Sequence, residues 1–208
     1  MRESLHMHMG GMRSFVRDQL GKLPWIMGIL FVVCSATGYV VFALNPSITK
    51  ELMKTISEMF AQAGVVSASG TVSFFGILLN NWFAMLFSVL YGFLPFVFLP
   101  VLAVVSNGLL LGAVAAFYTI SGTSLTLFFA GILPHGIFEI PALLLAVSMG
   151  VALCRNLIRL ITHSPRAVPL VEFLTGLLQT MLLLIFPLIL AAAAVEAFVT
   201  PAILQMLL

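Results

Sequence analysis

The chain contains very few charged residues. Only 8% of its 208 residues are charged and 62% are hydrophobic, whereas soluble domains carry about 25% charged residues. The mean hydropathy of +1.19 points the same way and excludes a soluble globular protein. The net charge of +2 is small, and no basic stripe alternates with aromatic residues, so we expect no nucleic-acid partner.

Cysteines and enzyme motifs are also scarce. The two cysteines, Cys34 and Cys154, lie in or at the end of apolar runs, which excludes a disulfide framework and a CxxC zinc site. The sequence lacks HExxH, GxSxG and a glycine-rich phosphate loop. We therefore favour a protein that is not an enzyme. A metal-bound water beside Glu139 or Glu196 is the one catalytic arrangement left open.

The apolar residues are gathered into stretches long enough to cross a bilayer, which takes about 20 residues. We predict an all-α, polytopic membrane bundle of about five transmembrane helices with short interfacial helices. The first apolar stretch is itself long enough to span, so we expect no cleavable signal peptide. Residues 1–23 are interpreted as a cytoplasmic tail and residues 24–208 as one bundle domain, with spans at about 24–44, 72–93, 96–118, 134–153 and 171–199.

Prolines divide and bend the longer apolar regions. Gly92, Pro95 and Pro100 separate the second span from the third, because proline interrupts a helix. The piece 125–133 precedes Pro134 and is interpreted as interfacial or re-entrant. In the fifth span, Pro187 predicts a kink.

Two segments outside the predicted spans have informative sequence patterns, one amphipathic and one rich in His and Met. Asn45 and Pro46 are typical of an N-cap and first helical residue. The residues that follow, 48–60, predict an amphipathic helix on the outer surface, with a solvated connector as the alternative. In the N-terminal Leu5-His-Met-His-Met9, His6 and His8 could bind copper or nickel, but we expect a disordered terminus.

The basic residues are distributed unevenly along the chain. Lys50 and Lys54 follow the first span. The other seven of the nine basic residues precede the first span or lie between the fourth and fifth spans: Arg2, Arg13, Arg17, Lys22, Arg155, Arg159 and Arg166. Positive residues stay on the cytoplasmic side. We therefore predict a multi-pass protein of the bacterial cell membrane with a cytoplasmic N-terminus and an external C-terminus.

His135 and Glu139 are ionisable residues inside a predicted span. Such residues are costly in a bilayer and indicate a functional site. Four residues apart on a helix, they share one face, about 6 Å from each other. They could share a proton or a metal ion.

Other polar residues fall at a similar depth. With a rise of 1.5 Å per residue, six polar residues are expected in the outer half of the bilayer: Asn80, Asn81, Asn107, His135, Glu139 and Glu196. The asparagines could serve only as hydrogen-bonding glue between helices, and Glu139 could bond to His135 or Asn107. Alternatively, His135, Glu139 and Glu196 form a site for a divalent cation, with zinc as the first choice.

Small residues repeat at helical spacing in the third span. Gly108, Gly112 and Ala116 form a small-xxx-small stripe, and Ala191 to Ala194 does the same in the fifth span. Such stripes allow close helix contacts. We favour packing within the bundle, with a homodimer as the alternative.

These motifs together resemble the stage II sporulation protein M family. The resemblance is carried by Asn80-Asn81, Gly92, Asn107-Gly108, Gly112, Pro134-His135-Gly136, Glu139, Pro141-Ala142 and the run Glu196 to Pro201. It implies a polytopic scaffold that anchors a peptidoglycan-degrading complex, with stage II sporulation proteins D and P, during engulfment. The family also occurs in organisms that do not sporulate. Asn81, Asn107, His135, Glu139 and Glu196 are family-motif positions for which the resemblance implies no role.

Three functions are compatible with these features. The resemblance and the lack of catalytic motifs favour a membrane scaffold that partners the lipid bilayer and cell-wall hydrolases. His135, Glu139 and Glu196 would also suit an intramembrane metal-dependent hydrolase. A small transporter would account for the intramembrane carboxylates, but five spans without an inverted repeat disfavour it.

Overall fold

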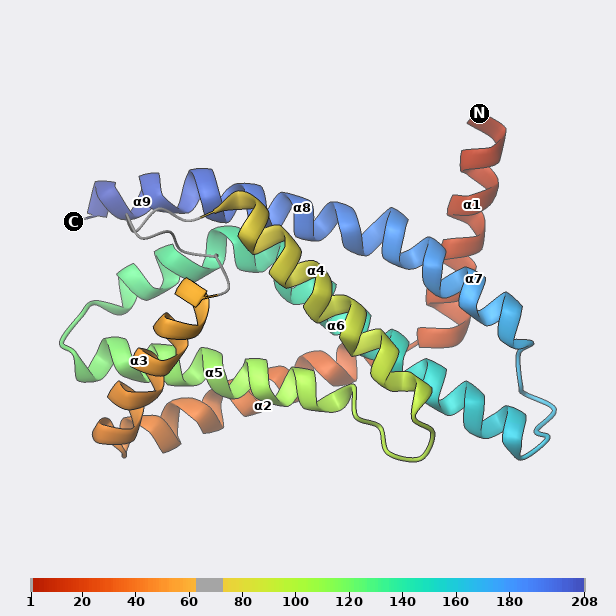
Figure 1. Ribbon diagram of the computed structural model, residues 1–208, viewed down its shortest axis with the longest axis horizontal. Helices are drawn as coiled ribbons and strands as arrows, with labels where there is room; N and C mark the ends of the chain where they lie inside the picture. Colours follow the sequence, from red (N-terminus) through yellow and green to blue (C-terminus); the bar gives the residue numbers. More distant parts are fainter. Residues whose placement is uncertain (1, 63–72, 208) are drawn as a thin grey trace.

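The computed structural model describes residues 2–62 and 73–207, with the side chains of residues 2–8 and 60 outside that description. Every regular element in this part of the chain is a helix. Five helical stretches are long and apolar enough to cross a membrane: Leu23–Ala43, Phe74–Phe93, Val101–Ile120, Leu125–Ile161 and Leu170–Leu207. The predicted all-α membrane bundle is confirmed. The stretches Leu23–Ala43, Val101–Ile120 and Leu170–Leu207 run roughly along the long axis of the molecule, whereas Phe74–Phe93 and Leu125–Ile161 cross it obliquely, and the two termini lie near opposite ends (Figure 1).

The second and third spans are separated by a tight turn at the prolines. Helix α4 (Phe74–Leu90) continues as the short helix η2 (Tyr91–Phe93), and α5 begins only at Val101. Residues 96–100, expected in the third span, are outside it because Phe96 and Phe98 have positive φ angles of 70° and 53°. A β-carbon at Gly92 would lie 2.9 Å from the Cα atom of Gly150, so the turn packs directly on the fourth span.

The fourth span, α6 (Leu125–Ile161), is one continuous helix of 37 residues. The prediction that 125–133 is a separate interfacial or re-entrant piece is wrong. The Ser124 side chain caps the helix by accepting a hydrogen bond from the Thr126 backbone N–H at 3.1 Å. Pro134 lies inside the helix rather than at its start, as membrane helices permit when neighbouring helices pack around them. Helix α6 contacts α2, α4, α5, α8 and α9 and forms the centre of the bundle.

The fifth span is a chain of α-helical and π-helical segments. These are α7 (Leu170–Thr180), η3 (Met181–Ile185), α8 (Phe186–Ala194), η4 (Val195–Val199) and α9 (Thr200–Leu207). Each π-helical segment ends two residues before a proline, Pro187 after η3 and Pro201 after η4. Proline lacks an N–H and crowds the carbonyl four residues earlier. The wider π-helical turn lets the helix continue past it.

The N-terminus is ordered as a helix. Helix α1 (Arg2–Phe15) and the π-helical segment η1 (Val16–Leu20) precede α2 (Leu23–Ala43). The expected disordered terminus is therefore wrong from Arg2 onward, while the side chains of His6 and His8 are outside the described part. Phe15 packs edge-on against Phe173 of α7, with ring centroids 5.1 Å apart. Arg155 donates a hydrogen bond to the Gln19 carbonyl at 2.6 Å.

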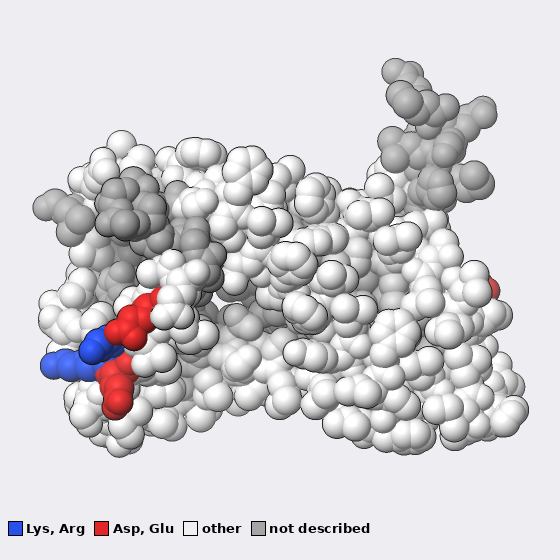
Figure 2. Space-filling view, viewed as in Figure 1, with Lys and Arg blue, Asp and Glu red and all other residues white. Residues whose placement is uncertain are grey.

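The segment after the first span is a helix, α3 (Pro46–Gln62). Asn45 does not cap it as predicted, because its side chain donates back to the Val41 carbonyl at 2.7 Å. Instead, the buried Thr49 hydroxyl donates to the Phe42 carbonyl at 2.7 Å and ties α3 to the end of α2. Figure 2 shows most of the charged side chains visible on this face gathered at the end of the molecule that carries α3.

Helices α2 and α5 have the closest approach in the bundle. A β-carbon at Gly108 would lie 2.8 Å from Cβ of Cys34, and one at Gly112 would collide with the backbone of Ser35 and Tyr39. Ala116 continues the stripe and is fully buried. The small residues of α5 thus face another helix of the same chain.

Candidate functional site

His135 and Glu139 lie one turn apart on α6 and are both half-buried. Pro134 and Pro141 flank the pair within the helix. Neither proline can donate a backbone hydrogen bond. The helix nevertheless continues through both, so the imidazole and the carboxyl group remain on one face.

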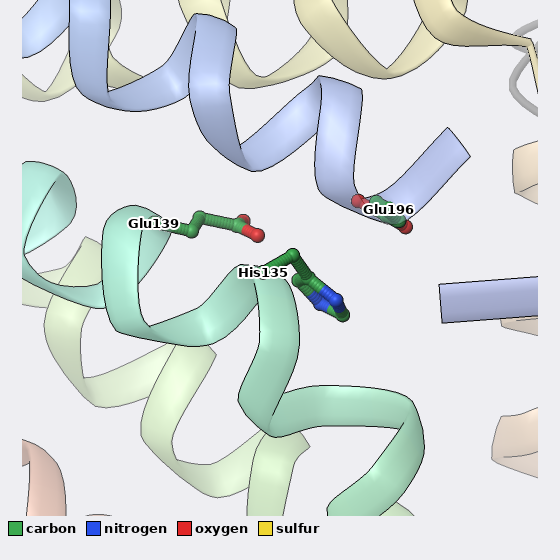
Figure 3. A group of neighbouring side chains, drawn as sticks. All are labelled: His135, Glu139 and Glu196. Carbon is green, nitrogen blue, oxygen red and sulfur yellow. The ribbon is translucent and has the colours of Figure 1, made fainter. Parts of the chain in front are cut away.

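Glu196 comes from η4 in the last span and is also half-buried. One nitrogen of His135 and one carboxylate oxygen from each glutamate lie within 4.8 Å of one another. Figure 3 shows the three side chains at the space between α6 and the last span. The structure thus brings together three residues that are separated by up to 61 positions in the sequence.

A cavity of about 420 Å³ opens beside these three residues. Its walls come from α2, α4, α5, α6 and η4, with apolar side chains such as Phe31, Ile77 and Met85. All the polar residues that were expected in the outer half of the bilayer line this cavity: Asn80, Asn81, Asn107, His135, Glu139 and Glu196. The cavity is therefore apolar on one part of its wall and carries two carboxyl groups and an imidazole on another.

The three asparagines have different environments. Asn81 is buried, with 7% of its surface exposed, and accepts a hydrogen bond from the Asn80 side chain at 3.4 Å. Asn107 is exposed and donates to the Ala103 carbonyl of its own helix at 2.8 Å. The alternative in which Glu139 bonds to Asn107 is therefore not what the structure contains.

Two buried polar atoms at the cavity lack a hydrogen-bond partner. These atoms are Nδ1 of His135 and Nδ2 of Asn81. Among the described residues, two other buried side-chain atoms lack a partner, Nε of Arg155 and Oγ1 of Thr200. A buried polar atom without a partner costs about 1–3 kcal/mol. Two of the four atoms thus belong to residues that line this cavity, one on α6 and one on α4.

The donor set can serve one kind of chemistry well. An imidazole nitrogen and two carboxylate oxygens are ligands for zinc and similar divalent metals. Three protein ligands leave a fourth position for water or a substrate group, as in open zinc sites. Without a cation, two ionised carboxylates in a medium of low dielectric constant repel each other strongly.

Some features that shape the site were not predicted from the sequence. The π-helical turn that carries Glu196 was missed, although Pro201 five residues later is a signal for it. The exposed setting of Asn80 and Asn107 was missed as well, because residue depth along a helix does not say which way a side chain faces.

The sequence was compared with known protein families, curated proteins and solved structures. The family described as stage II sporulation protein M matches residues 27–201. The chain belongs to this family. The stage II sporulation protein M match extends from α2 to α9 and includes every residue of the candidate site, whereas α1 precedes it. Neither a curated protein nor a solved structure matches the chain.

Proposed function

We propose that the chain is a membrane scaffold that anchors a peptidoglycan-remodelling complex of the cell envelope. The observation that supports this role is the stage II sporulation protein M match over residues 27–201, which contains α3 and three of the five apolar stretches in full and most of the other two. By family resemblance, the partners are cell-wall hydrolases related to stage II sporulation proteins D and P, and the process is engulfment.

Helix α3 is the surface best suited to such partners. It carries four exposed charged residues, Lys50, Glu51, Lys54 and Glu58, beside the exposed apolar side chain of Ile48. A surface that combines apolar and charged side chains is typical of protein interfaces. Because most positive residues lie at the opposite end of the bundle, α3 is on the outer side in our proposal. That is the side where peptidoglycan lies.

Site-specific photo-crosslinking in living cells tests this role. A photoreactive amino acid replaces Glu51 on α3, and the matched control replaces Arg166, an exposed residue in the loop after α6. We expect position 51, and not position 166, to form covalent adducts with cell-wall hydrolases that mass spectrometry identifies. Adducts with lipid alone at position 51, or hydrolase adducts at position 166 alone, would contradict the proposed arrangement.

A further inference from the structure

We propose that His135, Glu139 and Glu196 bind one divalent transition-metal ion, zinc in the first place, which joins α6 to the last span. The inference concerns a site within the bundle and does not depend on the scaffold role. It is carried by the convergence of the three ligand atoms on one cavity wall.

The geometry requires little adjustment to hold an ion. Zinc binds nitrogen and oxygen ligands at about 2.0–2.2 Å. Ligand atoms around a common ion at that distance lie about 3–4 Å from each other. The three atoms here lie within 4.8 Å of one another. Rotation of a glutamate side chain about its flexible bonds is enough to close the remaining gap.

The unpaired polar atoms supply an independent observation. The buried Nδ1 of His135 has no hydrogen-bond partner, although the imidazole of a metal ligand uses one nitrogen for the metal and the other for a hydrogen bond. The buried amide Nδ2 of Asn81 also has none. Asn81 lines the same cavity, and an amide N–H of this kind can donate to a water on an ion or to a ligating carboxylate. A bound hydrated ion would satisfy both.

The ligand types select among cations. Magnesium and calcium prefer sites made of oxygen ligands alone. An imidazole nitrogen with two carboxylates favours zinc, manganese, iron or cobalt. The two carboxylates neutralise the charge of a divalent ion, so the complete site is close to neutral overall. A neutral site is compatible with the apolar wall formed by Phe31, Ile77 and Met85.

The position of Glu196 makes the ion a link between two spans. Glu196 lies on η4, and η4 contacts both α6 and α4. A π-helical turn is an interruption of regular helix that occurs frequently at functional sites. A metal ion bound by Glu196, His135 and Glu139 would connect this interruption in the last helical stretch to α6, the central helix of the bundle.

The test measures metal binding to the full-length chain purified without a histidine tag. His6→Asn and His8→Asn are introduced throughout, because the N-terminal run Leu5-His-Met-His-Met9 could itself bind a metal. The protein is equilibrated with zinc, freed of loose metal by gel filtration and analysed for bound metal. Cobalt is then substituted for zinc, since its visible absorption reports the number and type of ligands.

We expect about one zinc per chain and a cobalt spectrum typical of four or five nitrogen and oxygen ligands. Glu139→Gln, Glu196→Gln and His135→Asn should each lose the metal and the rise in melting temperature that zinc produces in the parent. Matched controls are Glu172→Gln, an exposed carboxylate of the same last span, and His163→Asn, in an exposed loop. Both controls should keep the metal.

Several results would overturn the site. One is a parent protein that retains no metal, and another is metal retained by all three cavity variants. Equal loss in the cavity variants and the controls would show that the binding is unspecific. Melting curves in the presence of a chelator separate a lost ligand from a lost fold, because a folded variant without the site melts like the metal-free parent.

Discussion

The carboxyl group of Glu139 on α6 and that of Glu196 on η4 line the same cavity, and one oxygen of each lies within 4.8 Å of the other and of a nitrogen of His135. The pair lies between the two longest helical stretches of the chain. Two like charges so close would push these helices apart unless an ion or a proton is present. What occupies this gap therefore influences the packing of the last span.

Replacement of Pro201 by alanine should weaken metal binding without touching a ligand. Alanine restores the backbone N–H and relieves the crowding that accompanies η4. We expect the π-helical turn to revert to α-helix and to turn Glu196 away from His135. The zinc dissociation constant, measured by competition with a chelating dye, should rise about 10- to 100-fold, the range found for residues that orient metal ligands.

Pro187→Ala is the matched control for this prediction. Pro187 stands in the same relation to η3 as Pro201 does to η4, but η3 does not line the cavity. Its replacement should leave the zinc affinity within about twofold, because the change lies more than two turns from Glu196. If both variants lost zinc affinity equally, the loss would come from a general change in helix stiffness and not from the direction in which Glu196 points.

The site illustrates what the sequence could and could not predict. Counting residues along each span placed Asn81, Asn107, His135, Glu139 and Glu196 in the outer half of the bilayer, and in the structure all of them line one cavity. The rise per residue of a helix is constant, so such a count needs no tertiary information, although the count for His135 and Glu139 started at Pro134 whereas α6 starts at Leu125. The rotation of each helix about its axis depends on packing between helices, and Asn107 is consequently exposed where a shared interior was expected.

Gly112→Leu should destabilise the fold strongly. A side chain there meets the backbone of Ser35 and Tyr39, which has no freedom to move aside. Overpacking costs about 1–3 kcal/mol where neighbours can adjust, and we expect at least that loss of unfolding free energy. Gly108→Leu should behave similarly. The measurement is thermal unfolding in detergent.

Gly131→Leu is the control for these two variants, because no atom lies within 4 Å of a β-carbon at Gly131. It is also inside a membrane-spanning helix, so the change in side-chain hydrophobicity is the same. Unchanged melting for Gly112→Leu would contradict the close contact between α2 and α5.

The span boundaries show a second limit of sequence patterns. Prolines ended helices as predicted between the second and third spans, where Pro95 and Pro100 lie in a turn. Pro134 does not end a helix, because α6 is packed on several sides by other helices and continues through this residue. A proline's effect depends on whether neighbouring helices stabilise the helix around it. The ordered α1 was missed for a related reason, since its partner α7 is distant in the sequence.

The predicted orientation can be checked with introduced cysteines. Cys154 is fully buried and donates its thiol hydrogen to the Leu94 carbonyl at 3.4 Å, so a thiol reagent should not reach it. Thr55→Cys on α3 and Arg166→Cys in the loop after α6 are both exposed. In a Cys34→Ser background, a membrane-impermeant thiol reagent added to intact cells should label position 55 only. Labelling of position 166 alone would invert the proposed topology.

Phe15→Ala should release α1 from the bundle. The ring of Phe15 is buried against Phe173 and Gly176, and loss of a buried phenylalanine costs about 3–5 kcal/mol. Backbone amides of α1 should then exchange hydrogen at least about 100-fold faster, as measured by mass spectrometry. Arg13→Ala, at an exposed position of the same helix, should leave the exchange rate nearly unchanged. Equal rates in both variants would show that α1 is held by other contacts.

The docking of α1 on α7 has a consequence for how the protein is made. Phe15 is synthesised well before its partners Phe173 and Gly176, with four membrane-spanning helices made in between. Helix α1 therefore has no packing partner on α7 until α7 itself has been made, because a segment cannot dock on one that has not yet left the ribosome. The docking of α1 is thus a late step in the assembly of the bundle, although α1 is made before all five spans.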